Sequence, residues 1–342
     1  MLDEDPILTR FTHTHTHTHT QLAVCVSSVA LILSGAFASA GTCPDNMQPT
    51  FTNEETLDSA YQPPPPDDER GILHRFRFTP PNAAPYDKFP TVLMLPPDVF
   101  HLEYGDQGNP GERGATYDLE HAGFLVFQID HRLVAPGHLP GQHSSGIAPA
   151  QTDDVKRQIL AALADPQCNG NIYLVGGSAG GTLALRCALD SASTVPGWDN
   201  DARLHIKAVV SLSGPTNLDD WSHPDLSDDE YVRFETDVDN YVGLTYPDHT
   251  DGPLLAASPV NLITSGIATS SPPVRLYGSQ FDTVSHTQQD DMKAALLSIG
   301  ATVTYTYFEG SDNHAYDNWH VIDPTTNNCV SIDVISFLHS YP

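Results

Sequence analysis

The residues best suited to chemistry form the pattern Gly-Gly-Ser-Ala-Gly at 176–180, with Ser178 at its centre. The apolar run NIYLV precedes the pattern and the helix-forming run TLALRCAL follows it. A serine hydroxyl is a weak nucleophile, so it must be held exposed, next to a base and near donors for an oxyanion. A sharp strand-to-helix turn meets these conditions, and its glycines let the backbone pass closely. The pattern therefore predicts a nucleophile at Ser178, the alternative being a plain glycine-rich turn.

The partners of such a serine are predicted from their order in the chain. An acid and then a histidine should follow it, each in a loop after a later strand. Asp282 ends the apolar run VRLYGSQF and His314 follows the run TVTYTYFEG. Alone, Asp282 would equally suit a helix cap and His314 a surface loop. His286 is a rival base that would open a helix, and Asp312 lies too near His314, so we expect Asp282 to orient His314 as the base.

These residues need a scaffold of alternating strands and helices. Apolar runs, several of them continuous, predict strands buried on both faces of a sheet at 71–78, 91–95, 123–130, 171–177, 206–214, 272–282 and 302–310. Helical periodicity predicts helices at 150–164, 179–190, 285–299 and 331–340. This alternation implies an α/β fold with a mostly parallel central sheet and helices on both faces. Ligands of such folds bind at the carboxyl ends of the strands.

One segment interrupts the alternation. Residues 217–255 are acidic and rich in aromatic side chains, and they lie between two predicted strands. We interpret them as a small cap insertion over the site, with a long surface excursion as the alternative. Asp219, Asp220 and His223 fall in this segment and are weaker catalytic candidates for that reason.

Residues 1–40 are predicted to be a leader. Residues 21–40 are apolar and end in Ala38-Ser39-Ala40, a signal-peptidase pattern, so we expect cleavage near Ala40 and a secreted or periplasmic protein. Small and polar residues in the stretch disfavour a permanent membrane span. The acidic flank at 3–5 argues against a signal peptide. The repeat THTHTHTHT at 12–20 could chelate a metal, but we assign it no mature function.

Residues 41–70 are predicted to be an N-terminal arm or linker, since they are polar and contain four consecutive prolines at 63–66. The catalytic domain is then expected at 71–342. Outside the leader, Cys43, Cys168, Cys187 and Cys329 could form disulfides in an oxidising compartment. We expect Cys187 to be a buried free thiol, which leaves the other three competing for one bridge. No cysteine pair has metal-site spacing, so no structural zinc is expected.

The charge balance bears on partners. Acidic residues number 43 and Lys plus Arg number 15, for a formal net charge of -28. Such a surface should repel nucleic acid and anionic membranes. Neither is therefore an expected partner.

Several motifs together carry a family resemblance. The motifs VGGSAGG, IDHRLVAPGHLPG, LLAASPVNLIT, GSQFDTVS and NHAYDNW resemble α/β-hydrolase esterases related to hormone-sensitive lipase and to bifunctional acetylxylan/feruloyl esterases, over roughly residues 71–340. The resemblance implies the α/β-hydrolase fold and carboxylic-ester hydrolysis through an acyl-enzyme, without a cofactor.

The oxyanion loop departs from that family. The amide of Ala179 is expected to donate to the oxyanion from the start of a helix. The family's second donors come from His-Gly-Gly, where this chain has Leu-Pro-Pro-Asp-Val-Phe at 95–100. Because Pro97 has no N–H, the second donor must be Asp98, which matches the residue that commonly serves, or Val99.

Two alternative functions remain, and the sequence does not identify the substrate. A serine peptidase of the same fold is possible from GGSxGG, but such enzymes carry a large N-terminal domain for which residues 1–70 leave no room. A non-catalytic esterase-like binding module would have lost a triad residue. For an esterase, acylated polysaccharide, short-chain esters and synthetic polyester fit equally well, so the substrate is a small-molecule or polymeric ester of open identity.

Overall fold

The chain divides into two units, Met1–Ser39 and Ala40–Pro342. The computed structural model describes residue 43 and residues 53–56, 74–97, 100, 110–132, 134, 146–220, 222–226, 228–244 and 251–342, all within the second unit. The predicted signal peptide, its cleavage near Ala40 and the His/Thr repeat lie outside the described residues.

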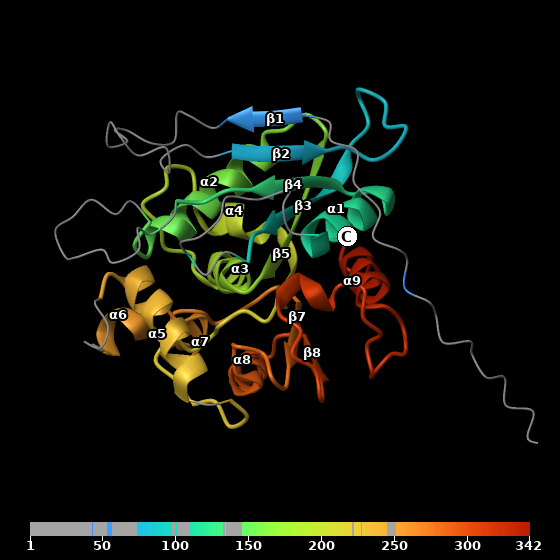
Figure 1. The fold of residues 1–342 in the computed structure, drawn as a ribbon. Helices are drawn as coiled ribbons and strands as arrows, with labels where there is room; N and C mark the ends of the chain where they lie inside the picture. Colours follow the sequence, from blue (N-terminus) through green and yellow to red (C-terminus); the bar gives the residue numbers. More distant parts are fainter. Residues whose placement is uncertain are drawn as a thin grey trace, which may run out of the picture. The chain divides into compact units, whose positions relative to one another are not determined.

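The second unit is built on a mostly parallel sheet (Figure 1). Its eight described strands are β1 (Asn53–Thr56), β2 (His74–Phe78), β3 (Phe89–Leu95), β4 (Leu125–Ile129), β5 (Cys168–Gly177), β6 (Ile206–Leu212), β7 (Val274–Ser279) and β8 (Val303–Phe308). They are ordered β1-β2-β4-β3-β5-β6-β7-β8. The two strands at one edge, β1 and β2, pair antiparallel, and all other pairs are parallel. The seven strands predicted from apolar runs are all present, and the predicted α/β fold class is confirmed.

The helices cover both faces of this sheet. Those described are α1 (Pro110–His121), α2 (Ala150–Leu163), α3 (Ala179–Leu189), α4 (Asn200–Leu204), α5 (Asp228–Val242), α6 (Asp251–Ala257), α7 (Pro259–Thr264), α8 (His286–Ser298) and α9 (Val330–His339). Helices α1 and α9 pack on one face, and α2, α3 and α8 pack on the other (Figure 1). The four predicted helices correspond to α2, α3, α8 and α9.

The continuous apolar runs are explained by two cores, one on each face. In β3, Leu93 and Leu95 point into the core shared with α2 and α3, while Val92 and Met94 point into the core shared with α1 and α9. Successive side chains of a strand face opposite ways, so a strand covered on both sides needs apolar residues at every position. The carboxyl ends of the parallel strands consequently meet at one edge of a rigid layer.

Two segments refine the predicted domain boundaries. Residues 41–70 were expected to be an arm or linker, yet four of them form β1, which extends the sheet beyond β2. The insertion 217–255 lies between β6 and β7 and contributes α5 and most of α6. Helix α5 is anchored at Tyr241, whose ring stacks on Phe100 with centroids 4.0 Å apart.

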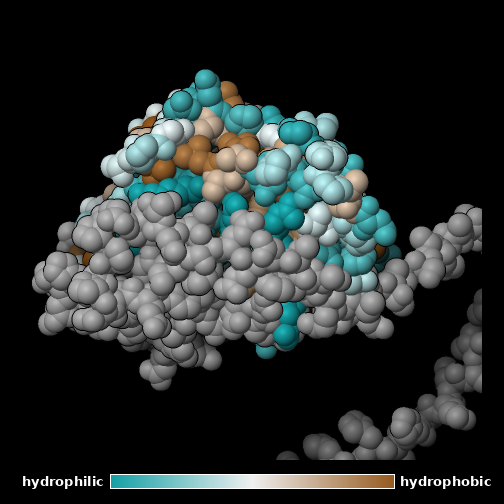
Figure 2. All heavy atoms as spheres, turned by 90° about the horizontal axis from the view of Figure 1, so that it is seen from above, coloured by the Kyte–Doolittle hydropathy of each residue, from teal (hydrophilic) through white to brown (hydrophobic). Residues whose placement is uncertain are grey.

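A disulfide joins Cys43 to Cys329, while Cys168 and Cys187 are buried free thiols, as predicted for Cys187. Burial raises the pKa of Cys187 to about 12, so this thiol is inert. In the part of the chain that the structure describes, no helix has the length and apolar character needed to span a bilayer. On the face shown in Figure 2, hydrophilic side chains surround a smaller group of hydrophobic ones.

Candidate active site

Ser178 lies in a strained turn between β5 and α3. Its φ is 47° and its ψ is -122°, a conformation that costs a residue with a Cβ about 1–3 kcal/mol. The Ser178 amide donates to the Leu212 carbonyl at 2.8 Å, and the Ser178 carbonyl accepts from the Gly181 amide at 2.9 Å. These bonds hold the turn. The exposure expected of Ser178 is not found: the residue is only 1% exposed, and its hydroxyl has no hydrogen-bond partner in the described structure.

The surrounding glycines are required by contact distances. A Cβ at Gly176 would lie 2.3 Å from the Gly180 carbonyl oxygen, and a Cβ at Gly180 would lie 2.5 Å from the Leu95 carbonyl oxygen. Both neighbours are backbone atoms that cannot move aside. The glycines of the sequence pattern are therefore required because the backbones of β3, β5 and α3 approach one another closely around the serine.

Asp282 and His314 form a hydrogen-bonded pair. Asp282 follows β7 and His314 follows β8, and His314 Nδ1 donates to Asp282 Oδ1 at 2.6 Å. The Val284 amide donates to the same oxygen at 3.0 Å. The Asp282 side chain is fully buried, whereas that of His314 is 29% exposed. A carboxylate at Nδ1 fixes the imidazole tautomer that leaves Nε2 free to accept a proton.

The electrostatics keep His314 basic. Burial lowers its pKa, but attraction and hydrogen bonding from Asp282, with a smaller contribution from Asp317, outweigh burial and raise the pKa above its ordinary 6.5. A raised pKa makes the imidazole a stronger proton acceptor, which suits a general base.

The histidine loop packs directly on the serine turn. A Cβ at Gly177 would lie 2.9 Å from the Ala315 Cβ, so the residue before Ser178 touches the residue after His314. The Ala315 amide also donates to Ser213 Oγ at 3.1 Å, which ties this loop to the end of β6. The structure thus brings all three predicted residues to the same end of the sheet. The Ser178 hydroxyl does not reach hydrogen-bond distance of His314, and such bonds often form only when substrate binds.

The rival residues have other contacts. His286 begins α8, as predicted, and its ring nitrogens lie 3.4 Å from Asp225 and 3.6 Å from Asp290. His223 donates from Nε2 to the Asp282 carbonyl at 2.7 Å. Its Nδ1 accepts from backbone amides of the same segment, so His223 braces the Asp282 loop and does not replace the base.

Tyr316 is a site residue that the sequence did not point to. It is buried, and its hydroxyl lies 3.1 Å from the Leu95 carbonyl oxygen and 3.0 Å from that of Val175. Those carbonyls sit near the ends of β3 and β5, beside the serine turn. Tyr316 therefore fixes the histidine loop to both strands. The only sequence signal was its place two residues after His314.

The structure describes one of the two predicted oxyanion donors. Ala179 is buried and is the first residue of α3. Because the first amides of a helix have no intrahelical acceptor, the Ala179 amide is free of one and lies at the positive end of the helix dipole. On the opposite side, the Pro96 carbonyl accepts from the Gly180 amide at 3.1 Å. The predicted second donor, Asp98 or Val99, lies outside the described residues. In the ranges that are described, no three His, Cys, Asp or Glu residues are grouped to hold a metal ion.

Solved structures share this architecture. A truncated carbohydrate esterase from gut microbiota superposes with a TM-score of 0.60 at 19% identity, covering 86% of this chain and 99% of that chain. Esterase Est2 from the planctomycete Thermogutta terrifontis, bound to propionate, gives a TM-score of 0.54 at 18% identity, covering 78% of this chain and 88% of that chain. At such identities the similarity shows the fold alone, which is that of the α/β-hydrolase esterases.

Sequence comparison gives the family. No curated protein is detectably similar to the chain in sequence. The profile of the BD-FAE family matches residues 105–296, more than half of the chain, and spans the serine turn and Asp282. This match supports carboxylic-ester hydrolase activity. The chain therefore belongs to BD-FAE, the family of bifunctional acetylxylan/feruloyl esterases.

Proposed function

We propose that the chain is a secreted serine esterase in which Ser178 is the nucleophile, His314 the base and Asp282 the orienting acid. The observation that carries the proposal is the strained Ser178 turn packed against a loop whose histidine is hydrogen-bonded to a buried carboxylate. Strain of this kind persists only where surrounding structure enforces it, and it concentrates at functional sites.

The mechanism runs through an acyl-enzyme. Ser178 Oγ attacks the ester carbonyl carbon while His314 Nε2 takes the hydroxyl proton, and Asp282 stabilises the resulting imidazolium. The oxyanion accepts hydrogen bonds from the Ala179 amide and from a second donor, proposed as Asp98. The tetrahedral intermediate then breaks the bond to the alcohol oxygen, which leaves with the proton from His314. Water, deprotonated by His314, then attacks the acyl carbon. The bond from that carbon to Ser178 Oγ breaks, His314 returns the proton to Oγ, and the carboxylic acid is released. No cofactor takes part in these steps.

Labelling tests the nucleophile. A fluorophosphonate should modify the parent protein once, at Ser178, and Ser178→Ala should abolish both labelling and p-nitrophenyl butyrate hydrolysis. Ser340→Ala, at an exposed serine that caps the C-terminal end of α9, is the matched control and should keep the labelling. A Ser178→Ala variant that stays active contradicts the proposal. Labelling also separates an esterase from a non-catalytic binding module, and amide substrates tested beside esters separate it from a peptidase.

The substrate class we propose is a short-chain or polysaccharide-linked acyl ester. The family is named for acetylxylan and feruloyl esters, and the structural relatives include a carbohydrate esterase and a propionate complex. Comparing p-nitrophenyl esters of increasing chain length with acetylated xylan, methyl ferulate and a polyester film would decide. Faster turnover of the polyester than of any small ester contradicts this assignment.

Secretion and domain organisation are part of the proposal. The Cys43–Cys329 disulfide supports an oxidising compartment, and we propose cleavage near Ala40, with 217–255 acting as a cap over the site. Mass spectrometry of the secreted protein tests the cleavage. A mature N-terminus far from Ala40 would contradict it.

A further inference from the structure

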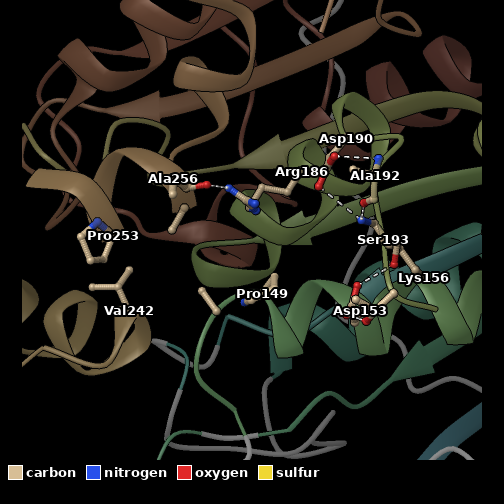
Figure 3. A pocket seen from close by; sticks show the side chains of 13 residues that line it. Pro149, Asp153, Lys156, Arg186, Asp190, Ala192, Ser193, Val242, Pro253 and Ala256 are labelled. Carbon is tan, nitrogen blue, oxygen red and sulfur yellow. Dashed lines mark hydrogen bonds and ion pairs between the residues drawn. The ribbon is translucent and has the colours of Figure 1, made fainter. Parts of the chain in front are cut away.

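One cavity lies away from the proposed triad. It has a volume of about 560 Å³ and is formed by α2, α3, α6 and the end of α5 (Figure 3). Neither Ser178, Asp282 nor His314 lines it. A cavity of this size accommodates a small organic ligand.

Arg186 is the unusual residue of this cavity. It lies between an apolar wall and a polar wall (Figure 3) and is only 5% exposed. Its Nη1 donates to the Ala256 carbonyl at 2.7 Å, but its Nε is buried without a partner, and no described carboxylate lies within ion-pair distance. A buried cation that is neither paired nor fully hydrogen-bonded is costly, typically by several kcal/mol.

The cavity's own carboxylates do not neutralise Arg186. Asp153 accepts from the hydroxyls of Ser193 at 2.7 Å and Thr194 at 2.9 Å. Asp190 accepts from Lys156 Nζ at 3.4 Å. Its other oxygen accepts from a backbone amide.

The charge and lining restrict the ligand. The two cations and two carboxylates that line the cavity cancel formally. Lys156 contacts Asp190, however, and Asp153 is bonded to hydroxyls. One ligand carboxylate could therefore pair with Arg186, while a multiply charged anion would be repelled more strongly by Asp153 and Asp190. The opposite wall is apolar and includes Val242, Pro253 and Ala256. A guanidinium presents a planar pair of donors that matches a carboxylate.

We propose that this cavity binds a monocarboxylate with an apolar body, whose carboxylate pairs with Arg186 and whose body contacts the Val242 wall. Carboxylic acids are also what the proposed reaction releases. That connection rests on the proposed function, whereas the binding site does not.

The test is calorimetric titration of the full chain with benzoate, beside benzamide as the uncharged ligand of the same shape. Benzoate should bind to the parent at one site. Benzamide should bind to the parent about 10- to 100-fold more weakly than benzoate does, and the Arg186→Gln variant should bind benzoate about 10- to 100-fold more weakly than the parent does, which is the contribution of a hydrogen bond to a charged group. Arg203→Gln is the matched control and should leave binding unchanged, because Arg203 donates to the Ala188 carbonyl and does not line the cavity.

A second pair of variants guards against misfolding. Ala256→Trp should fill the cavity from an exposed position and block benzoate, while Leu255→Trp, on the same helix but outside the cavity, should not. The titration is repeated after fluorophosphonate treatment, and benzoate should still bind. The proposal is overturned if benzoate does not bind, if benzamide binds equally, if neither Arg186→Gln nor Ala256→Trp weakens binding, or if Ser178 modification abolishes it. Failure of the labelling itself would instead count against the proposed function.

Discussion

Replacing Asp282 with asparagine tests how the proposed base is tuned. Asp282 Oδ1 accepts hydrogen bonds from both His314 Nδ1 and the Val284 amide. An asparagine oxygen can keep both bonds, so Asp282→Asn removes the negative charge while leaving the geometry largely in place. The loss of activity therefore reports the missing charge together with any change of imidazole tautomer that the amide group permits.

The negative charge of Asp282 should have a large effect on kcat, because it lies very close to His314. Opposite charges 2.6 Å apart attract by about 6 kcal/mol at an effective dielectric constant of about 20. Burial of His314 works against this attraction and offsets part of it. We expect kcat to fall by about 10²–10⁴-fold, up to the loss seen when a triad aspartate is neutralised in a serine protease.

The pH profile gives a second, independent readout. The base acts when neutral, so kcat/KM should fall at acid pH as His314 becomes protonated. In the parent this fall should be centred above pH 6.5, because Asp282 raises the pKa of His314. Removing the carboxylate charge lowers that pKa, so the acid limb of Asp282→Asn should move to lower pH while the plateau drops.

Initial rates with p-nitrophenyl butyrate from about pH 5 to pH 9 measure both effects across the range where a histidine titrates. Asp312→Asn is the matched control, since Asp312 is exposed and lies in the same loop as His314. It should leave both the plateau and the limb unchanged. If Asp282→Asn keeps kcat within about tenfold of the parent and the acid limb does not move, Asp282 is not the acid.

Three further predictions concern stability. Tyr316→Phe removes a hydroxyl bonded to buried carbonyls at the ends of β3 and β5 and should lower the unfolding free energy in urea by about 1–3 kcal/mol; no change would mean that the hydroxyl is not structural. Replacing Cys43 and Cys329 with serine should cost about 2–5 kcal/mol, and reductant should destabilise the parent but not the variant. Ser178→Gly and Ser178→Ala should both be inactive, but the glycine variant should be more stable by about 1 kcal/mol or more because it relieves the strained φ, and equal stabilities would argue against strain.

Much of the fold was predictable because hydrophobic burial leaves a direct trace in sequence. Strands covered on both faces appear as continuous apolar runs, such as VLML in β3 and IYLV preceded by polar residues in β5. β1 left no such trace, because the edge strand NEET is polar throughout. β1 belongs to the sheet through backbone hydrogen bonds, and any residue other than proline can make such bonds, so the sequence does not indicate them.

Some residues of the site were likewise predictable from the sequence, and others were not. Ser178 was predictable because its turn demands glycines at fixed spacing, and the order of serine, acid and histidine narrowed its partners. The brace from His223 to Asp282 and the bridge from Tyr316 to β3 were not predictable. Each ends on a backbone carbonyl, 59 and 221 residues away in sequence respectively. A carbonyl is present at every residue, so nothing in the sequence indicates which one is used.

Helix α3 connects the two sites proposed for this chain. All 11 of its residues are buried, and a core helix normally satisfies every polar group it carries. Thr182 follows that rule, since its hydroxyl donates to the Pro215 carbonyl. Two groups do not: the Ser178 hydroxyl at the N-terminal cap and Arg186 Nε near the C-terminal end. Departures from local satisfaction concentrate at functional sites, so the same physical reasoning that supports Ser178 as a nucleophile supports Arg186 as an anion-binding residue.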